Sequence, residues 1–234
     1  DHIRQNGPMS VATYWDMCLA HPQHGYYITR DPLGSAGDFV TAPEISQLFG
    51  EMIGIWILER WQDLGRPASV NVVEFGPGRG TLMADVLRIA KLMPDFLAAV
   101  QVYLVETSPV LRERQAASLA GYPVTWCATW DDVPQDAPVL VIGNEFLDAL
   151  PIHQYVIDGG ARHERRIILG EDGATLRFDR DGGDIEEISP ARESVIQAVC
   201  DRLKVTGGAV VMIDYGHDVS GYGDTFQAVK AHQF

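Results

Sequence analysis

Apolar residues recur along the chain with two spacings. Four short, nearly continuous apolar runs have the length and β-branched content of parallel strands buried on both faces, at 70–75, 100–105, 138–143 and 209–213. A weaker run at 124–126 predicts a fifth strand. Between these runs apolar residues return every three or four positions, which predicts helices at 82–90, 110–119 and 190–206. This alternation predicts an α/β fold built on a doubly wound parallel sheet.

The residues before this core predict a helical cap. Ser10 is placed to cap a helix that ends before Pro22. Thr41, with Glu44 three residues later, fits a capping box for one long amphipathic helix that ends at Gly65. The apolar stripe of that helix is expected to be core, and it consists of Ile45, Leu48, Phe49, Met52, Ile53, Trp56, Ile57 and Trp61.

A change of pattern after Pro151 predicts a smaller unit. Short strand patterns around paired glycines at 152–178 predict a β appendage, and the acidic, glycine-rich stretch 179–187 predicts a loop. We therefore expect a helical cap and lid at 1–66, the first part of the core at 67–151, the appendage with its acidic loop at 152–188, and the rest of the core at 189–234. Sheets of this type usually have two further strands, for which no pattern is found before Phe234.

Composition excludes several classes of function. The formal net charge of −14 argues against a nucleic-acid partner, because phosphate binding needs a basic surface, and it is compatible with basic protein partners. No apolar run is long enough to predict a membrane span. Three scattered cysteines indicate a reducing compartment without disulfides or a zinc site. His21 and His24 lack a third ligand nearby, so we expect no metal site there.

The stretch after the first core strand predicts a cofactor loop. Gly76, Gly78 and Gly80 separate that strand from a helix, and Glu74 stands two residues before the first glycine. Dinucleotide sites favour the spacing G-x-G-x-x-G, whereas the spacing here is G-x-G-x-G. An acid at this point suits a cationic ligand without phosphate better than a pyrophosphate. The pattern is similar to motif I of class I methyltransferases, which bind S-adenosylmethionine.

Glu106 follows the second core strand. An acid at this position binds a ribose hydroxyl in sheets of this type, so we expect the same role here. The alternative is a solvated acid before the turn at 107–109.

The fourth core strand leads into the sequence NEFLDALP at 144–151, at the carboxyl edge of the sheet. Asn144, Glu145 and Asp148 stand there among apolar residues, where burial is costly unless the polar groups bind something. Methyltransferases that act on base amines place an Asn or Asp, two prolines and an aromatic residue at this point. This chain has Asn144 but neither proline, so a nucleic-acid base is a poor substrate.

Six stretches together resemble the MidA-type family of methyltransferases. They are HPxxGYY at 21–27, GDFxTxPExSxxFG at 37–50, VVEFGPGRGTLMxDxL at 72–87, VExSPxLRxxQ at 105–115, NEFxDALP at 144–151 and IDYGH at 213–217. The resemblance implies a class I methyltransferase, dependent on S-adenosylmethionine, that methylates an arginine of a respiratory complex I subunit to symmetric dimethylarginine. It also implies the bacterial cytoplasm or the mitochondrial matrix.

Two carboxylates can grip a guanidinium bidentately, so Glu145 and Asp148 are the expected clamp, with Asn144 orienting it. Gly37, Asp38 and Phe39 are expected to cover the cofactor as a lid, together with Tyr26. Two alternatives stay open: a non-catalytic assembly scaffold that binds the cofactor, and a methyltransferase of small molecules. The sequence predicts no oligomeric state.

Overall fold

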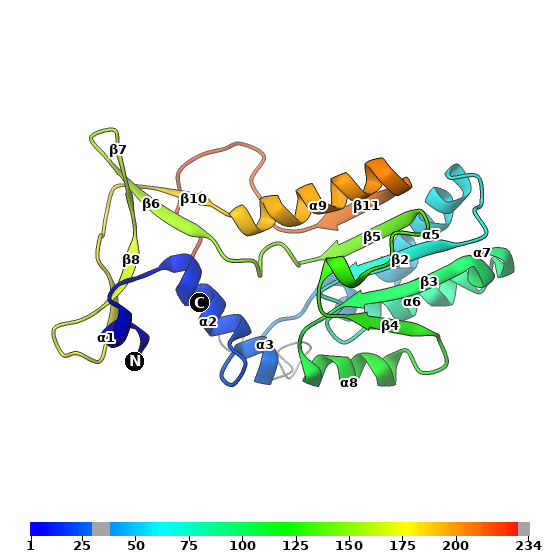
Figure 1. The fold of residues 1–234 in the computed structure, drawn as a ribbon, viewed down its shortest axis with the longest axis horizontal. Coiled ribbons are helices and arrows are strands. Elements are labelled where there is room, and N and C mark those ends of the chain that lie inside the picture. The colour runs from blue at the N-terminus through cyan, green and yellow to red at the C-terminus, as the bar shows by residue number, and fades with distance from the viewer. Residues whose placement is uncertain (30–37, 229–234) are drawn as a thin grey trace.

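A five-stranded parallel sheet, with helices on both faces, forms one end of the molecule, and two antiparallel sheets lie at the other end (Figure 1). This computed structural model describes residues 1–29 and 38–228. The strand order in the parallel sheet is β11-β5-β2-β3-β4. The strands are β2 (Val70–Phe75), β3 (Val100–Val105), β4 (Val124–Cys127), β5 (Val139–Asn144) and β11 (Gly208–Ile213). The predicted strands and the doubly wound α/β fold are confirmed.

The order of the strands fixes where a ligand can reach the sheet. From β2 the chain moves outward to β3 and β4, and it then returns to the other side of β2 to form β5 and β11. The connections after β2 and β5 therefore diverge at the carboxyl ends of these two strands, which is where ligands bind in sheets of this type. Both the glycine loop and the segment 144–151 begin at this edge.

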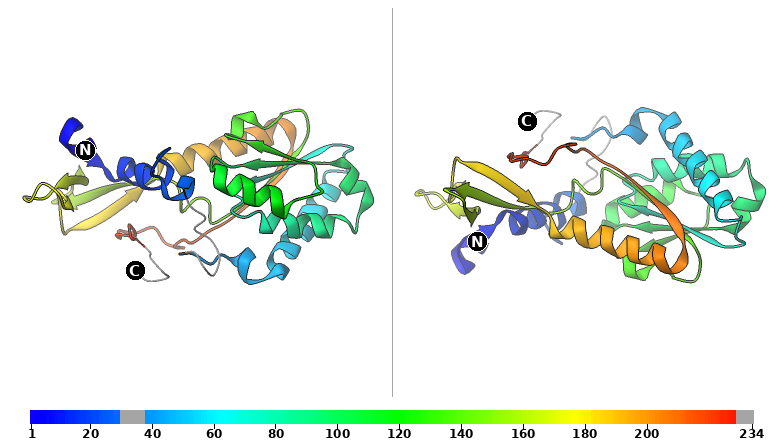
Figure 2. Two further views of the ribbon diagram at one scale, coloured as in Figure 1. Left: turned by 90° about the horizontal axis from the view of Figure 1, so that it is seen from below. Right: turned by 90° about the horizontal axis from the view of Figure 1, so that it is seen from above.

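Helices cover both faces of the sheet (Figure 2), and an apolar core on each face holds them to it. One core joins β2, β3 and β5 to α5 (Gln47–Asp63), α6 (Thr81–Ala90) and α7 (Pro94–Ala99). The other joins the opposite face to α9 (Pro190–Thr206) and to the 3-10 turn η1 (Trp130–Asp132). The remaining helices are α1 (His2–Asn6), α2 (Val11–Ala20), α3 (Tyr26–Thr29), α4 (Ala42–Ile45) and α8 (Pro109–Ser118).

The prediction of one long helix after Thr41 was wrong. The backbone is extended at Ser46, so the chain forms the single turn α4 and then α5. The side chain of Thr41 makes no capping hydrogen bond, which also contradicts the predicted capping box. The predicted stripe is buried only in the second half of α5, whereas Leu48 and Met52 are 61% and 54% exposed.

Two smaller expectations also failed. No helix was predicted between residue 90 and the strand at 100–105, but Pro94 begins α7, because a proline in the first turn needs no backbone hydrogen bond there. The acidic stretch expected to be a loop contains the strand β10 (Asp184–Ile188), which pairs with β6 in an antiparallel register. Cross-strand pairing supplies the backbone partners that the composition of this stretch does not reveal.

The antiparallel part of the chain forms two small sheets, ordered β1-β8-β9 and β10-β6-β7. The last described residues return to it: Arg165, which is almost fully buried, forms an ion pair of 2.6 Å with Asp224, and Gln154 donates to the same carboxylate at 2.8 Å. Besides β10, the strands of these two small sheets are β1 (Met9–Ser10), β6 (His153–Asp158), β7 (Ala161–Glu164), β8 (Arg166–Leu169) and β9 (Leu176–Phe178). In the part of the chain that the structure describes, no helix has the length and apolarity needed to cross a membrane.

Candidate functional site

The glycine loop between β2 and α6 approaches two other segments closely. Gly76, Gly78 and Gly80 have φ of 58°, 54° and 80°, in the left-handed region that favours glycine. A Cβ on Gly76 would lie 3.1 Å from the ring of Phe146, and one on Gly80 would lie 3.3 Å from the Cα of Gln115. The loop therefore packs directly against the segment after β5 and against α8.

Glu74 is buried at the carboxyl end of β2, with 3% of its surface exposed. Its Oε2 atom has no hydrogen-bond partner within the described residues. Burial, and then the nearby charge of Glu106, raise the pKa of Glu74 to about 8. A buried carboxylate that lacks a partner and faces a second acid is suited to a cationic group, which would satisfy the free oxygen and offset the like charges.

Glu106, at the end of β3, is held by its neighbours. Its Oε1 accepts the backbone N–H of Ser108 at 2.7 Å, and its Oε2 accepts the side-chain amide of Gln115 at 3.2 Å. Burial raises the pKa of Glu106, while these hydrogen bonds oppose that rise. The carboxylate is thus fixed beside the glycine loop.

Gln115 connects the two halves of this site, a role that the sequence did not reveal. It is fully buried on α8, and its amide nitrogen donates to the carbonyl of Gly78 at 2.8 Å as well as to Glu106. Its amide oxygen accepts the indole N–H of Trp126 at 2.8 Å. The sequence offers one signal for this role, a glutamine nine residues after Glu106 in a predicted helix. When such an amide is buried, it needs hydrogen-bond partners for both its nitrogen and its oxygen.

A second group of acids lies where β5 and β11 end. The charge of Asp214 acts on both Glu145 and Asp148, and the charge of Glu145 also acts on Asp148. Burial, and then the charges of Asp214 and Glu145, raise the pKa of Asp148 to about 7. Burial also raises the pKa of Glu145. Asp214, directly after β11, accepts the backbone N–H of Asp148 at 3.0 Å.

The backbone at Glu145 is unusual. Its φ is 50°, in the left-handed region that non-glycine residues rarely adopt, and its N–H donates to the carbonyl of Ile213 at 2.8 Å. The side-chain amide of Asn144 donates to the Glu145 carboxylate at 3.2 Å. Strain of this kind persists where the surrounding structure imposes it, and it is common at functional sites.

The N-terminal cap contributes to the same edge. Burial, and then the charges of Asp148 and Glu145, raise the pKa of Tyr27 to about 12, so the Tyr27 hydroxyl faces the acid group in its neutral form. The expected lid residues Asp38 and Phe39 both contact Tyr26, the first through a hydrogen bond from the Tyr26 hydroxyl and the second ring to ring. Gly37 lies outside the described residues.

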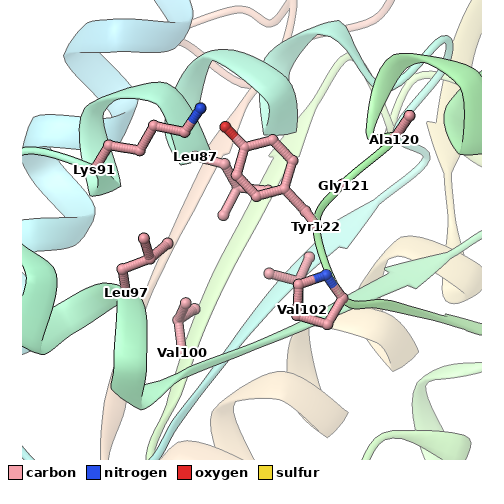
Figure 3. A pocket seen from close by; sticks show the side chains of 9 residues that line it. Leu87, Lys91, Leu97, Val100, Val102, Ala120, Gly121 and Tyr122 are labelled. Carbon is pink, nitrogen blue, oxygen red and sulfur yellow. The ribbon is translucent and has the colours of Figure 1, made fainter.

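Two cavities lie away from the glycine loop and the acid group. One, of about 350 Å³, is at the opposite edge of the sheet, between α6, α7 and the segment before β4; Lys91 and Tyr122 meet across its mouth (Figure 3). The other, of about 470 Å³, lies between the first three helices and the strands β8 and β9. Neither is lined by the glycine loop or by the acids at 145 and 148.

Comparison with known families decides the class. A family model described as "Putative S-adenosyl-L-methionine-dependent methyltransferase" matches residues 52–182 and 173–234. The chain belongs to this family. The family expected from the motifs is thereby confirmed, and so is S-adenosylmethionine as the cofactor of the family.

Curated relatives of this family member carry an arginine methyltransferase name. The chain is 35% identical to "Protein arginine methyltransferase NDUFAF7, mitochondrial" of Xenopus tropicalis over 271 residues, which cover 99% of this chain and 63% of the relative. It is 36% identical to the Caenorhabditis elegans homolog over 275 residues, covering 100% of this chain and 64% of the relative. The human protein is 34% identical, and the match covers 99% of this chain and 61% of the human protein. The chain thus spans less than two thirds of the length of these relatives.

Two crystal structures from Burkholderia thailandensis have the same fold. One is bound to S-adenosyl-homocysteine; it is 25% identical, has a TM-score of 0.74, and the match covers 92% of this chain and 60% of that chain. The other, a native structure, is 27% identical and has a TM-score of 0.72, and the match covers 92% of this chain and 59% of that chain. The first shows that a related sheet holds the demethylated form of the cofactor.

Proposed function

We propose that this chain is an S-adenosylmethionine-dependent methyltransferase whose substrate is an arginine of a protein. The main support for the proposal is the position of Glu145 and Asp148 beside Phe146, the residue that packs on the glycine loop. A carboxylate pair beside the cofactor loop suits a planar cation such as guanidinium. The names of the relatives from Xenopus, Caenorhabditis and human support the same substrate class.

The residues around the glycine loop fit the cofactor. The free oxygen of Glu74 would accept the ammonium group of its methionine part, and Glu106 would accept a ribose hydroxyl. Asp38 and Phe39, held by Tyr26, would cover it from the cap side. When bound, S-adenosylmethionine supplies an electrophilic methyl group on its sulfonium sulfur.

The acid group would hold the nucleophile. Glu145 and Asp148 would each accept N–H groups of the guanidinium and draw its positive charge towards them, which leaves the remaining nitrogen free to face the methyl carbon. As the N–C bond forms and the S–C bond breaks, the guanidinium must lose one proton to remain singly charged. Asp148, whose pKa is raised to about 7, is the group placed to accept that proton.

The finer assignment follows the family resemblance. It gives a respiratory complex I subunit as the protein substrate, symmetric dimethylarginine as the product, and the bacterial cytoplasm or mitochondrial matrix as the location. The net charge of −14 is consistent with a basic, arginine-rich substrate segment.

The test separates cofactor binding from catalysis. Calorimetry with S-adenosyl-homocysteine is followed by transfer of a tritiated methyl group to purified complex I subunits, with amino-acid analysis of the labelled product. We expect Glu145→Gln to keep cofactor affinity within about 3-fold and to lose at least about 100-fold in transfer. Asp218→Asn, an exposed acid a few residues after Asp214, is the matched control and is expected to stay active.

Three outcomes would contradict the proposal. Normal transfer by Glu145→Gln would exclude the carboxylate clamp. Cofactor binding without transfer to any protein substrate would favour the assembly scaffold. Transfer to a small-molecule acceptor, with no labelled protein, would favour a methyltransferase of small molecules.

A further inference from the structure

The single helical turn α4 lies between the glycine loop and the acid group, and it touches both. At its end, the Glu44 carboxylate accepts the hydroxyl of Thr81 at 2.5 Å and lies 3.7 Å from the guanidinium of Arg79. Thr81 is the first residue of α6, and Arg79 stands between the second and third glycines of the loop. Glu44 is thus bound to the loop that surrounds the cofactor site.

The other end of α4 reaches the acid group. The backbone N–H of Ala42 acts on the Glu145 carboxylate as a hydrogen-bond donor and opposes the rise in its pKa. Ala42 and Glu44 belong to one turn, which is closed by hydrogen bonds from Glu44 and Ile45 to the carbonyl of Thr41 at 2.9 and 3.2 Å. The residue between them, Pro43, is buried and has a fixed φ. A displacement at Glu44 is therefore transmitted to Ala42.

The contacts of Glu44 do not serve the helix that contains it. A capping-box glutamate would return to the backbone of Thr41, but the Glu44 carboxylate instead reaches Thr81, 37 positions away in the sequence. Such a contact between segments fixes the position of α4 relative to the loop.

We propose that Glu44 is a positioning residue that couples the glycine loop to Glu145 through α4, so that cofactor binding orders the carboxylate that receives the substrate. The inference rests on the function proposed above. Cofactor held by the loop would fix Thr81 and Arg79, these would fix Glu44, and the N–H of Ala42 would then hold Glu145 in one orientation. Coupling of this kind between two sites is typically 5- to 150-fold.

Hydrogen–deuterium exchange of the whole chain, with and without S-adenosyl-homocysteine, tests the coupling. In the unmodified chain we expect the cofactor to slow exchange at 76–81 and, by about 10-fold, at 42–46. Thr81→Val removes the donor to Glu44, and Glu44→Gln removes the charge facing Arg79. Both should keep the slowing at 76–81 and reduce that at 42–46 to less than about 2-fold. Thr81→Ser restores the hydroxyl and should restore the coupling.

A second measurement detects an effect that a purely structural role of Thr81 would not produce. Loss of the Ala42 hydrogen bond should raise the pKa of Glu145 in Thr81→Val, as followed by carbon NMR of its carboxyl group, and Thr81→Ser should not change it. Glu59→Gln, an exposed acid on α5, is the control and should behave as the unmodified chain.

The outcomes distinguish this inference from the proposed function. If S-adenosyl-homocysteine binds but exchange at 42–46 is slowed equally in the unmodified chain and in Thr81→Val, the coupling is excluded and the methyltransferase assignment stands. If calorimetry detects no binding to the unmodified chain, both are overturned.

Discussion

Glu74 and Glu106 are buried side by side at the ends of adjacent strands, yet they differ in their partners. Every position of β2 pairs in register with β3, which brings the two acids to the same edge of the sheet. Glu106 accepts hydrogen bonds from Ser108 and Gln115, whereas one oxygen of Glu74 has no partner within the described residues. The unpaired oxygen of Glu74 therefore offers an acceptor for a cationic group at a defined point, which is a more specific indication of the ligand than the glycine spacing.

The first prediction concerns the stability of the free protein. The pKa of Glu74 is raised from 4.5 to about 8 on folding, so the folded state binds more protons than the unfolded state between these values. Its contribution to stability is therefore complete below about pH 4.5 and is lost as the pH rises to about 8. We expect Glu74→Gln to become more stable relative to the unmodified chain from pH 5 to 8, by more than about 1 kcal/mol.

Urea unfolding at several pH values measures this difference. Glu113→Gln, an exposed acid on α8, is the control and should show no such trend. Parallel stability curves for Glu74→Gln and the unmodified chain would show that Glu74 is not perturbed. The same variant should bind S-adenosyl-homocysteine more weakly, because the amide cannot offset the ammonium charge.

The second prediction concerns Glu106. Glu106→Gln keeps the size of the side chain but replaces one acceptor oxygen by a donor, so it can no longer accept from both Gln115 and a ribose hydroxyl. We expect the affinity for S-adenosyl-homocysteine, measured by calorimetry, to fall by about 10- to 100-fold. The affinity of Glu106→Gln for adenine or methionine alone should not fall comparably, since neither molecule carries the ribose. An unchanged affinity would assign Glu106 to the positioning of α8 only.

The third prediction uses Asp214 to adjust the pKa of Asp148. Asp148 is ionised only above about pH 7, so binding of a guanidinium should strengthen as the pH rises through 7. Asp214→Asn removes a like charge, which lowers the pKa of Asp148, and its amide oxygen can still accept the N–H of Asp148. The pH profile for an arginine-containing peptide should therefore move to lower pH.

Asp148→Asn supplies the matching control for that profile, because it should weaken peptide binding at every pH and remove the rise through pH 7. Fluorescence anisotropy of a labelled peptide measures both. A profile that moves to higher pH in Asp214→Asn would contradict the arrangement of the acids.

Much of the core could be predicted because local patterns determine it. The strands are short and apolar, the glycine loop needs positive φ, and each acid stands at the end of a strand. Contacts between distant segments could not be predicted. Gln115 and Tyr27 join the site through the fold, and no spacing along the chain relates them to the glycine loop.

The helix after Thr41 shows the limit of periodicity. An apolar stripe predicts that a helix face avoids water, but it does not identify what covers that face. Glycines at 50 and 54 allow α5 to approach α6 closely, where a Cβ on Gly50 would lie 2.5 Å from Asp85. Close packing on the glycine side turns Leu48 and Met52 away from α6, so small residues rather than large ones determine the orientation of this helix.

The last prediction follows from that orientation. Leu48→Glu and Met52→Glu place charges at positions that are 61% and 54% exposed, and each should change the free energy of unfolding of this chain by less than about 0.5 kcal/mol. Ile57→Ala, on the same helix but fully buried, should cost about 2–5 kcal/mol through the cavity it leaves. Denaturant unfolding of the three variants measures this contrast. A large loss in Leu48→Glu would show that the stripe is covered in solution, because a carboxylate cannot be buried there without a partner.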